Sequence, residues 1–384
     1  MIYNSASWLV LQLVLCILRE VVMKKIITVL AIAVLVGGCG GNSGQEVLVS
    51  AGEDTFTNPI KDRGADPWVF YHDGMYYYTN TLGNKIGLWR TKDITELRNA
   101  EYKTVYVPPK NTMYSKQLWA PEIMNIDGNW YVYFAADDGD NFNHKMYVIE
   151  NTSPDPFEGE FKMKGKIQTD KNDNWAIDGS LFKHKGDYYM IWSGWPVTPF
   201  VEYETQCIYI AKMKNPWTLA TDRVLLSKPE HYWEKIWINP EEWNNTNDHK
   251  CYVNEGPEVI AHDDKLFLVY SASGCWTPHY TLGMLIADAD SDILKPDSWT
   301  KVPHPVFQHS AENGVYGTGH NCFFKSPDGK EDWLLYHAND NPEDGCGGKR
   351  SPRAQLIQWN EDGTPDFGVP LSTSTRIRKP SGTK

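Results

Sequence analysis

The residues with the clearest chemical potential are three acids and one histidine that stand at matched places in a repeated pattern. The pattern is an apolar pair, a polar turn and an alternating aromatic stretch, and it occurs five times. Four residues before the second apolar residue of each copy stand Asp66, Ala120, Asp178, Gly256 (with Glu255 beside it) and His320. Burying a carboxylate at the start of an apolar strand is costly, so packing does not explain these acids. We therefore expect them to share a functional site.

Three carboxyl groups around one small pocket are suited to the hydrolysis of a glycosidic bond. One protonated carboxyl gives its proton to the leaving oxygen, and one carboxylate activates a water molecule. A third carboxylate raises the pKa of the acid by like-charge repulsion. If acid and base stand roughly 6.5 to 9.5 Å apart, a water fits between them and the anomeric centre is inverted.

The five copies also predict the elements that must position these groups. Each copy reads as a β-hairpin, because strand-forming residues flank a short polar turn. They are VFYHDGMYYY at 69–78, IMNIDGNWYVYF at 123–134, LFKHKGDYYMIW at 181–192, VIAHDDKLFLVY at 259–270 and FFKSPDGKEDWLLYH at 323–337. Further strand-like runs lie between them, and amphipathic helical periodicity is absent from this part of the sequence.

A unit of about four strands repeated five times predicts an all-β, single-domain, five-bladed β-propeller over residues 56–384. In such a fold the first strand of each blade lines the central channel. The matched positions would therefore converge at one mouth of the channel. This explains why an apolar strand begins with Asp66.

Composition and charge narrow the classes of partner. The chain has 384 residues, of which 13% are aromatic, and a formal net charge of −12. The negative charge argues against nucleic acid and against an anionic membrane surface. The abundance of Trp and Tyr favours stacking on flat ligands such as sugar rings, with most Trp expected in the core.

The N-terminus is typical of an export signal. Met23 is followed by Lys24 and Lys25, an apolar run at 26–36, and small residues before Cys39. This resembles a bacterial lipoprotein signal over 23–39, in which Cys39 is lipidated. We interpret residues 1–22 as an extension from a start assigned too early, and 40–55 as a tether. The expected location is the periplasmic or cell-surface face of a bacterial membrane, with the lipid as the only membrane contact.

The remaining cysteines are odd in number and contain no CxxC pair. They are Cys207, Cys251, Cys275, Cys322 and Cys346. A zinc site is not expected from this pattern, whereas one or two disulfides would suit an exported protein. Spacing alone leaves the pairing open.

The matched motifs together resemble glycoside hydrolase family 43. In order they are Asp-Pro at 66–67, Trp-Ala-Pro-Glu at 119–122, Ile-Asp-Gly-Ser at 177–180, Glu-Gly-Pro-Glu at 255–258 and Gly-His-Asn at 319–321. The resemblance runs from residue 58 to about 370. It implies a five-bladed propeller that works by inversion and needs no catalytic cofactor. It also implies that Asp66 is the general base, Glu255 the general acid and Asp178 the residue that raises and orients the acid.

Five further residues are considered for the pocket and its surroundings. His320 resembles the family histidine near a central, structural Ca²⁺, and the alternative is a histidine that is only hydrogen-bonded in the channel. Arg353 resembles the arginine that reaches the innermost sugar, and the alternative is an ordinary salt bridge. Trp119 is expected in the pocket wall or in the core. Trp195 and Trp276 follow inner hairpins and are expected at the pocket rim.

The favoured activity is release of terminal α-L-arabinofuranose from plant polysaccharide side chains by a monomer. The alternatives within the family are a β-xylosidase, acting on xylose-containing glycans, and an endo-arabinanase. Asp66 counts against the family's galactan-acting members, which often lack the base. A retaining, fructan-type hydrolase is disfavoured because its motifs are missing from the matched positions. A catalytically inactive glycan-binding propeller is the alternative of another class, although all three carboxyl groups are present.

Overall fold

The computed structural model describes residues 54–198, 205–237 and 251–384, which belong to a compact unit spanning Val47–Lys384. The predicted extension, the signal, Cys39 and nearly all of the tether lie outside the described residues. Within those ranges, the structure contains no helix with the length and apolar character needed to span a membrane.

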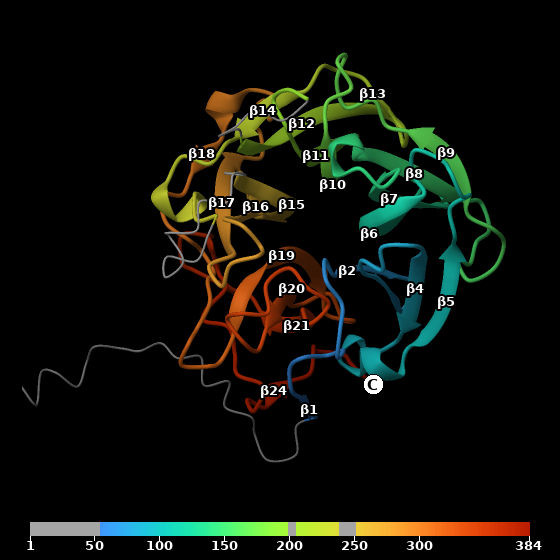
Figure 1. Ribbon diagram of the computed structural model, residues 1–384. Helices are drawn as coiled ribbons and strands as arrows, with labels where there is room; N and C mark the ends of the chain where they lie inside the picture. Colours follow the sequence, from blue (N-terminus) through green and yellow to red (C-terminus); the bar gives the residue numbers. More distant parts are fainter. Residues whose placement is uncertain (1–53, 199–204, 238–250) are drawn as a thin grey trace, which may run out of the picture. The chain divides into compact units, whose positions relative to one another are not determined.

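The described chain forms five blades of antiparallel strands around a common centre, as predicted (Figure 1). Blade one contains β2 (Trp68–His72), β3 (Met75–Thr79), β4 (Ile86–Thr91) and β5 (Glu101–Tyr106). Blade two contains β6 (Lys116–Ile126), β7 (Asn129–Asp137), β8 (Lys145–Asn151) and β9 (Lys162–Lys166). Blade three contains β10 (Ala176–His184), β11 (Asp187–Gly194), β12 (Thr205–Asn215) and β14 (Val224–Ser227), with β13 (Thr218–Leu219) beside β12.

Blade four contains β15 (Tyr252–His262), β16 (Lys265–Ala272), β17 (Thr281–Asp288) and β18 (Thr300–Lys301). Blade five contains β19 (Tyr316–Lys325), β20 (Asp332–Asn339) and β21 (Ser351–Leu356), and the short pair β22 (Gln358–Trp359) and β23 (Pro365–Asp366) follows it. The described helical elements are short 3₁₀ turns at Ile94–Asn99, Asn141–Asn143, Tyr232–Glu234 and Pro296–Ser298. The inner strands β2, β6, β10, β15 and β19 lie nearest the centre of the ring (Figure 1).

The five predicted hairpins are confirmed as the first two strands of the five blades. In blade one, His72 pairs with Met75 across a two-residue turn, and both turn residues have positive φ: Asp73 at 49° and Gly74 at 76°. Asp and Gly tolerate this region, and its twist matches that of the strands. The register is therefore set locally by the turn.

The ring closes where the first and last described strands meet. β1 (Thr55–Phe56) pairs with β24 (Ile377–Arg378). Blades one and five also contact each other directly, since Tyr76 donates a hydrogen bond to the Lys325 carbonyl at 2.8 Å. Large aromatic side chains fill the layers between blades, and Trp130, Trp192 and Trp333 are almost completely buried. This rigid ring fixes the inner strand ends relative to one another.

Candidate active site

Each inner strand departs from regular β geometry at the position matched in the repeat. The φ angles there are 56° at Asp66, 43° at Ala120, 52° at Asp178, 51° at Gly256 and 52° at His320. In β6, β10, β15 and β19 the pairing register shifts at this point, and Asp66 precedes β2 directly. A bulge whose first residue is left-handed redirects the side chains beside it. The repeat found in the sequence is thus a repeated backbone bulge that aims side chains at one mouth of the channel.

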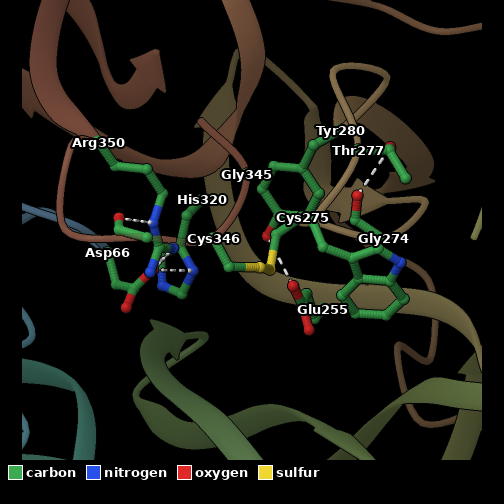
Figure 2. Close-up of a disulfide and its surroundings, with 12 residues drawn as sticks. Asp66, Glu255, Gly274, Cys275, Thr277, Tyr280, His320, Gly345, Cys346 and Arg350 are labelled. Carbon is green, nitrogen blue, oxygen red and sulfur yellow. Dashed lines mark hydrogen bonds and ion pairs between the residues drawn. A yellow bond between two sulfur atoms is a disulfide. The ribbon is translucent and has the colours of Figure 1, made fainter. Parts of the chain in front are cut away.

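Asp66 is surrounded by cationic and hydrogen-bonding groups. Its Oδ1 lies 2.9 Å from Arg350 Nη1 (Figure 2). Its Oδ2 accepts a hydrogen bond from Thr81 Oγ1 at 2.6 Å. His320 Nδ1 lies 3.5 Å from Oδ1, and the Asp66 amide donates to His337 Nδ1 at 3.1 Å. Burial alone would raise the pKa of Asp66, but Arg350, the two histidines and Thr81 together lower it below its usual range. Asp66 is therefore a carboxylate at neutral pH.

Glu255, one residue before the blade-four bulge, has a different environment. Tyr280 donates a hydrogen bond to its Oε1 at 2.9 Å (Figure 2). Gln206 donates to its Oε2, also at 2.9 Å. Burial raises the pKa of Glu255, and the charge of Asp66 raises it further, against the lowering effect of the two hydrogen bonds and Arg350. The two carboxyl groups are thus driven in opposite directions by their surroundings.

The pKa of Asp178 is affected by the charges of both Glu255 and Asp66. Its Oδ2 accepts a hydrogen bond from the Gly256 amide at 3.0 Å, which ties the bulges of blades three and four together. Burial, then the charge of Glu255 and then that of Asp66 raise the pKa of Asp178 well above its usual value. Asp178 and Glu255 therefore resist losing both of their protons.

Two adjoining cavities meet at these residues. The smaller, about 230 Å³, is lined by Asp66, Thr81, Trp119, Ile177, Asp178, Glu255, Cys275, His320, Cys346 and Arg350. The larger, about 450 Å³, is lined by Trp119, Asn141, Phe142, Trp175, Ile177, Trp195, Gln206, Cys251, Glu255, Cys275, Trp276 and Cys346. We call them the acid pocket and the aromatic chamber. Glu255 lines both, whereas Asp66, Asp178 and Arg350 line only the acid pocket.

The three tryptophans expected near the pocket all line the aromatic chamber. Trp195 stacks on Trp175 with ring centroids 4.5 Å apart and planes 9° apart. Trp119 lies on the imidazole of His144 at 4.0 Å. Trp276 is 46% exposed, although it is a large apolar side chain next to a cavity. The exposed ring of Trp276 is suited to stacking on a sugar, whereas Trp195 is only 5% exposed.

The arginine in the acid pocket is Arg350 and not Arg353, so the expectation for Arg353 is corrected. Arg353 is completely buried in β21 and pairs with Asp340 at 2.5 Å. Arg350 lies just before β21, in the loop above the pocket, where its guanidinium reaches Asp66. A loop residue can lean over the pocket, whereas Arg353 is held inside blade five by the strand pairing with Tyr336.

His320 occupies its expected place beside Asp66. Among the described residues no three His, Cys, Asp or Glu side chains converge as a metal ligand set. The oxygens of Asp66 are already paired with Arg350 and Thr81. Ca²⁺ prefers six to eight oxygen ligands, so an ion near His320 would need water for most of its shell.

Several site residues were missed in the sequence. Thr81, Gln206, Tyr280, His337 and Arg350 contact the carboxyl groups or their backbone but lie outside the matched positions. A disulfide joins Cys275 to Cys346, both of which line the two cavities. Arg350 stands three residues before Arg353, so the sequence indicates the right segment but not the right arginine.

Comparisons with known proteins show which family the chain resembles. The model of "Glycosyl hydrolases family 43" matches residues 56–365. An extracellular exo-alpha-(1->5)-L-arabinofuranosidase of Streptomyces avermitilis is 39% identical over 327 residues, covering 83% of this chain and 64% of the relative. The chain therefore spans slightly less than two thirds of that relative's length.

Two further matches cover most of the matched protein. An enzyme of Streptomyces chartreusis with the same name is 35% identical over 292 residues, covering 75% of this chain and 84% of the relative. The crystal structure of an alpha-L-arabinofuranosidase from Lactobacillus brevis superimposes with a TM-score of 0.75 at 35% identity, covering 83% of this chain and 98% of that one.

Proposed function

This chain belongs to glycosyl hydrolases family 43, and from that premise we propose that it is an inverting, exo-acting α-L-arabinofuranosidase. It releases terminal α-L-arabinofuranose from side chains or oligosaccharides of plant polysaccharides. One observation carries the proposal: Glu255 lines both cavities, while Asp66 lines only the acid pocket. A glycosidic bond at the junction has a proton donor beside its leaving oxygen and a base on the sugar side.

Asp66 acts as the general base. Its lowered pKa keeps it ionised, so it accepts a proton from the water molecule whose oxygen attacks the anomeric carbon. Thr81 and Arg350 hold the two carboxylate oxygens in place. Because the water attacks from the face opposite the leaving group, the sugar is released first as the β anomer.

Glu255 acts as the general acid. Its raised pKa keeps a proton available, which passes to the leaving oxygen as the glycosidic bond breaks. Asp178 lies close enough for the two carboxyl groups to influence each other's ionisation, which supports its role as the residue that modulates the acid. Its hydrogen bond to the Gly256 amide also orients the backbone next to Glu255. The reaction uses these carboxyl groups and one water molecule.

The two cavities divide the substrate between them. The acid pocket, about 230 Å³, accepts the terminal sugar, with Arg350 in the place first given to Arg353. The aromatic chamber accepts the leaving part of the chain, with Trp119, Trp195 and Trp276 as stacking surfaces. A small pocket on one side of the junction and a larger chamber on the other favours exo over endo cleavage.

We also propose that the protein is exported and anchored by a lipid. Export is supported by the relatives from Streptomyces, which are named extracellular, and anchoring by lipidation of Cys39 rests on the signal-like sequence. A Cys39→Ala protein that still partitions with membranes would refute the anchor.

His320 is proposed to lie beside a structural Ca²⁺ held mainly through water. Metal analysis of the purified protein, and its melting temperature with and without a chelator, test that proposal.

The function is tested with aryl α-L-arabinofuranoside and aryl β-D-xyloside substrates, each with wild type and Asp66→Ala. We expect hydrolysis of the arabinoside that is lost in the variant, and ¹H NMR should detect the β anomer first. Preference for the xyloside would keep the mechanism and change the substrate. Inactivity on both, together with internal cleavage of arabinan, would replace exo by endo action. Inactivity on every arabinoside and xyloside, arabinan included, would favour a glycan-binding protein.

A further inference from the structure

We propose that the Cys275–Cys346 disulfide is a positioning element of the active site, which holds the loop carrying Trp276 against the loop carrying Arg350. The inference rests on the proposed function and adds a component to it. The disulfide joins residues 71 positions apart in sequence, from two different blades. Figure 2 shows it between the Asp66–Arg350–His320 cluster and the Gly274–Thr277 turn.

The two cysteines occupy the boundary between the cavities. Both line the acid pocket and both line the aromatic chamber, a property they share with Glu255, Trp119 and Ile177. The disulfide is therefore part of the wall at the junction where the scissile bond is proposed to lie. A change in its position alters the fit of the sugar on both sides of that bond.

Cys346 is connected to Arg350 through a short, internally bonded loop. Asn339 donates a side-chain hydrogen bond to the Gly345 carbonyl at 2.9 Å. Lys349 pairs with Asp344 at 2.6 Å within the same loop. These bonds make the segment between β20 and β21 a compact unit. Holding Cys346 thus restrains the base of the Arg350 side chain, whose guanidinium contacts Asp66.

Cys275 is connected to Trp276 even more directly, as its neighbour in the chain. Thr277 closes the turn by donating from its amide and its hydroxyl to the Gly274 carbonyl, both at 2.9 Å. The turn also touches the other loop: a Cβ built on Gly345 would lie 3.4 Å from the Trp276 carbonyl oxygen. Gly345 has a φ of 54°, which suits glycine at this close approach. The disulfide is the covalent link across this contact.

The disulfide therefore affects the binding of the terminal sugar and of the leaving group. Arg350 holds Asp66 on the side of the terminal sugar, and Trp276 presents an open ring on the leaving side. Loss of the bond frees the two loops to move apart. Catalysis then suffers through Arg350 with every substrate, and binding suffers through Trp276 only when the leaving group is itself a sugar.

The test compares wild type with a Cys275→Ser/Cys346→Ser double variant at a temperature well below unfolding. We expect kcat to fall about ten- to a hundred-fold on an aryl α-L-arabinofuranoside and on an arabinofuranose oligosaccharide, since small displacements at a reacting centre have effects of this size. KM should rise for the oligosaccharide alone. Reduction of wild type should cause the same changes, reoxidation should reverse them, and the double variant should not respond to either.

A matched control separates positioning from stability. Ile377→Ala removes a buried side chain from β24, which lines neither cavity, and should lower the melting temperature without changing kcat or KM. If the double variant behaves like Ile377→Ala, the disulfide only stabilises the fold and the inference is wrong.

Hydrogen–deuterium exchange gives a reading that does not depend on activity. Reduction should accelerate amide exchange in residues 274–278 and 344–350 together. Wild type that hydrolyses no arabinoside would refute the proposed function, and the exchange experiment would still decide the inference. Unchanged exchange in both segments on reduction would overturn it.

Discussion

Arg350 Nη1 lies 2.9 Å from Asp66 Oδ1, and this ion pair joins the loop before the last strand of blade five to the start of blade one. Both side chains are largely buried, so the guanidinium has a strong effect on the carboxylate. It is the main influence that overcomes burial and keeps the pKa of Asp66 low. The base of the proposed reaction, in the first blade, thus depends on a residue from the last blade of the chain.

Asp66→Asn should reduce kcat by about 10²- to 10⁴-fold, the usual contribution of a general base. KM should change little, because the amide keeps the size of the side chain. Steady-state kinetics on an aryl arabinofuranoside checks this. Asp62→Asn is the control, since Asp62 is an exposed carboxylate paired with Arg98. Equal losses in the two variants would contradict the assignment.

Glu255→Gln should lose activity in a way that depends on the leaving group. A natural sugar leaving group needs the proton, whereas an aryl group of low pKa departs without it. We expect a loss of about 10²-fold or more on an oligosaccharide and a much smaller loss on a dinitrophenyl arabinofuranoside. Similar losses on both substrates would exclude Glu255 as the acid.

Two further variants should move the alkaline limb of the kcat/KM pH profile in opposite directions. Asp178→Asn removes the carboxyl group whose ionisation is coupled to that of Glu255, so the pair can no longer share a proton and activity is lost at lower pH. Tyr280→Phe removes a hydrogen bond that lowers the pKa of Glu255, so that pKa rises and the limb moves to higher pH. Profiles measured with one substrate at constant ionic strength check the signs. Shifts in the same direction would contradict this account.

Arg350→Met and Arg353→Met should separate activity from stability. The first variant should lose kcat by about ten-fold or more, because Arg350 holds the base. The second should destabilise the fold by about 0.5–3 kcal/mol, because Arg353 is completely buried in blade five and the variant loses its packing and its hydrogen bond to Asp340. Kinetics and thermal unfolding on the same samples check both. The reverse pattern would restore Arg353 to the site.

Trp276→Ala should weaken binding on the leaving side alone. A stacked ring contributes about 0.5–1.5 kcal/mol, so KM for an oligosaccharide should rise roughly two- to ten-fold. KM for an aryl arabinofuranoside should change less. Tyr232→Ala serves as control, because Tyr232 is 70% exposed and lines neither cavity. An unchanged KM for the oligosaccharide would remove Trp276 from the chamber's function.

The fold and the three carboxyl groups could be predicted because one backbone feature recurs in every blade. The left-handed bulge of every blade and the two-residue turn of the first four each leave a signature within a few residues, so the five copies can be aligned without a structure. Asp66, Asp178 and His320 occupy that bulge, and Glu255 adjoins it. A local backbone feature that recurs along the chain can therefore be recognised in the sequence.

The residues that contact these carboxyl groups could not be predicted, because they lie outside the repeated pattern. Arg350, Tyr280 and Gln206 reach the site from loops and outer strands whose lengths differ between blades, so no repeat marks them. The pairing of Cys275 with Cys346 depends on two loops meeting above the ring. Sequence spacing does not distinguish Arg350, which lies in a loop, from Arg353, which is paired with a neighbouring strand.

Asp66 and the basic residues that lower its pKa are synthesised at different times, because they come from different blades. Asp66 emerges with the first blade, whereas His320, His337 and Arg350 emerge with the last. Until β19 to β21 dock beside β2, the carboxylate lacks the three positive or polarisable neighbours that set its pKa. A nascent chain therefore contains all three carboxyl groups before it can use them. For the proposed reaction, we therefore expect activity only after the last blade has closed the ring.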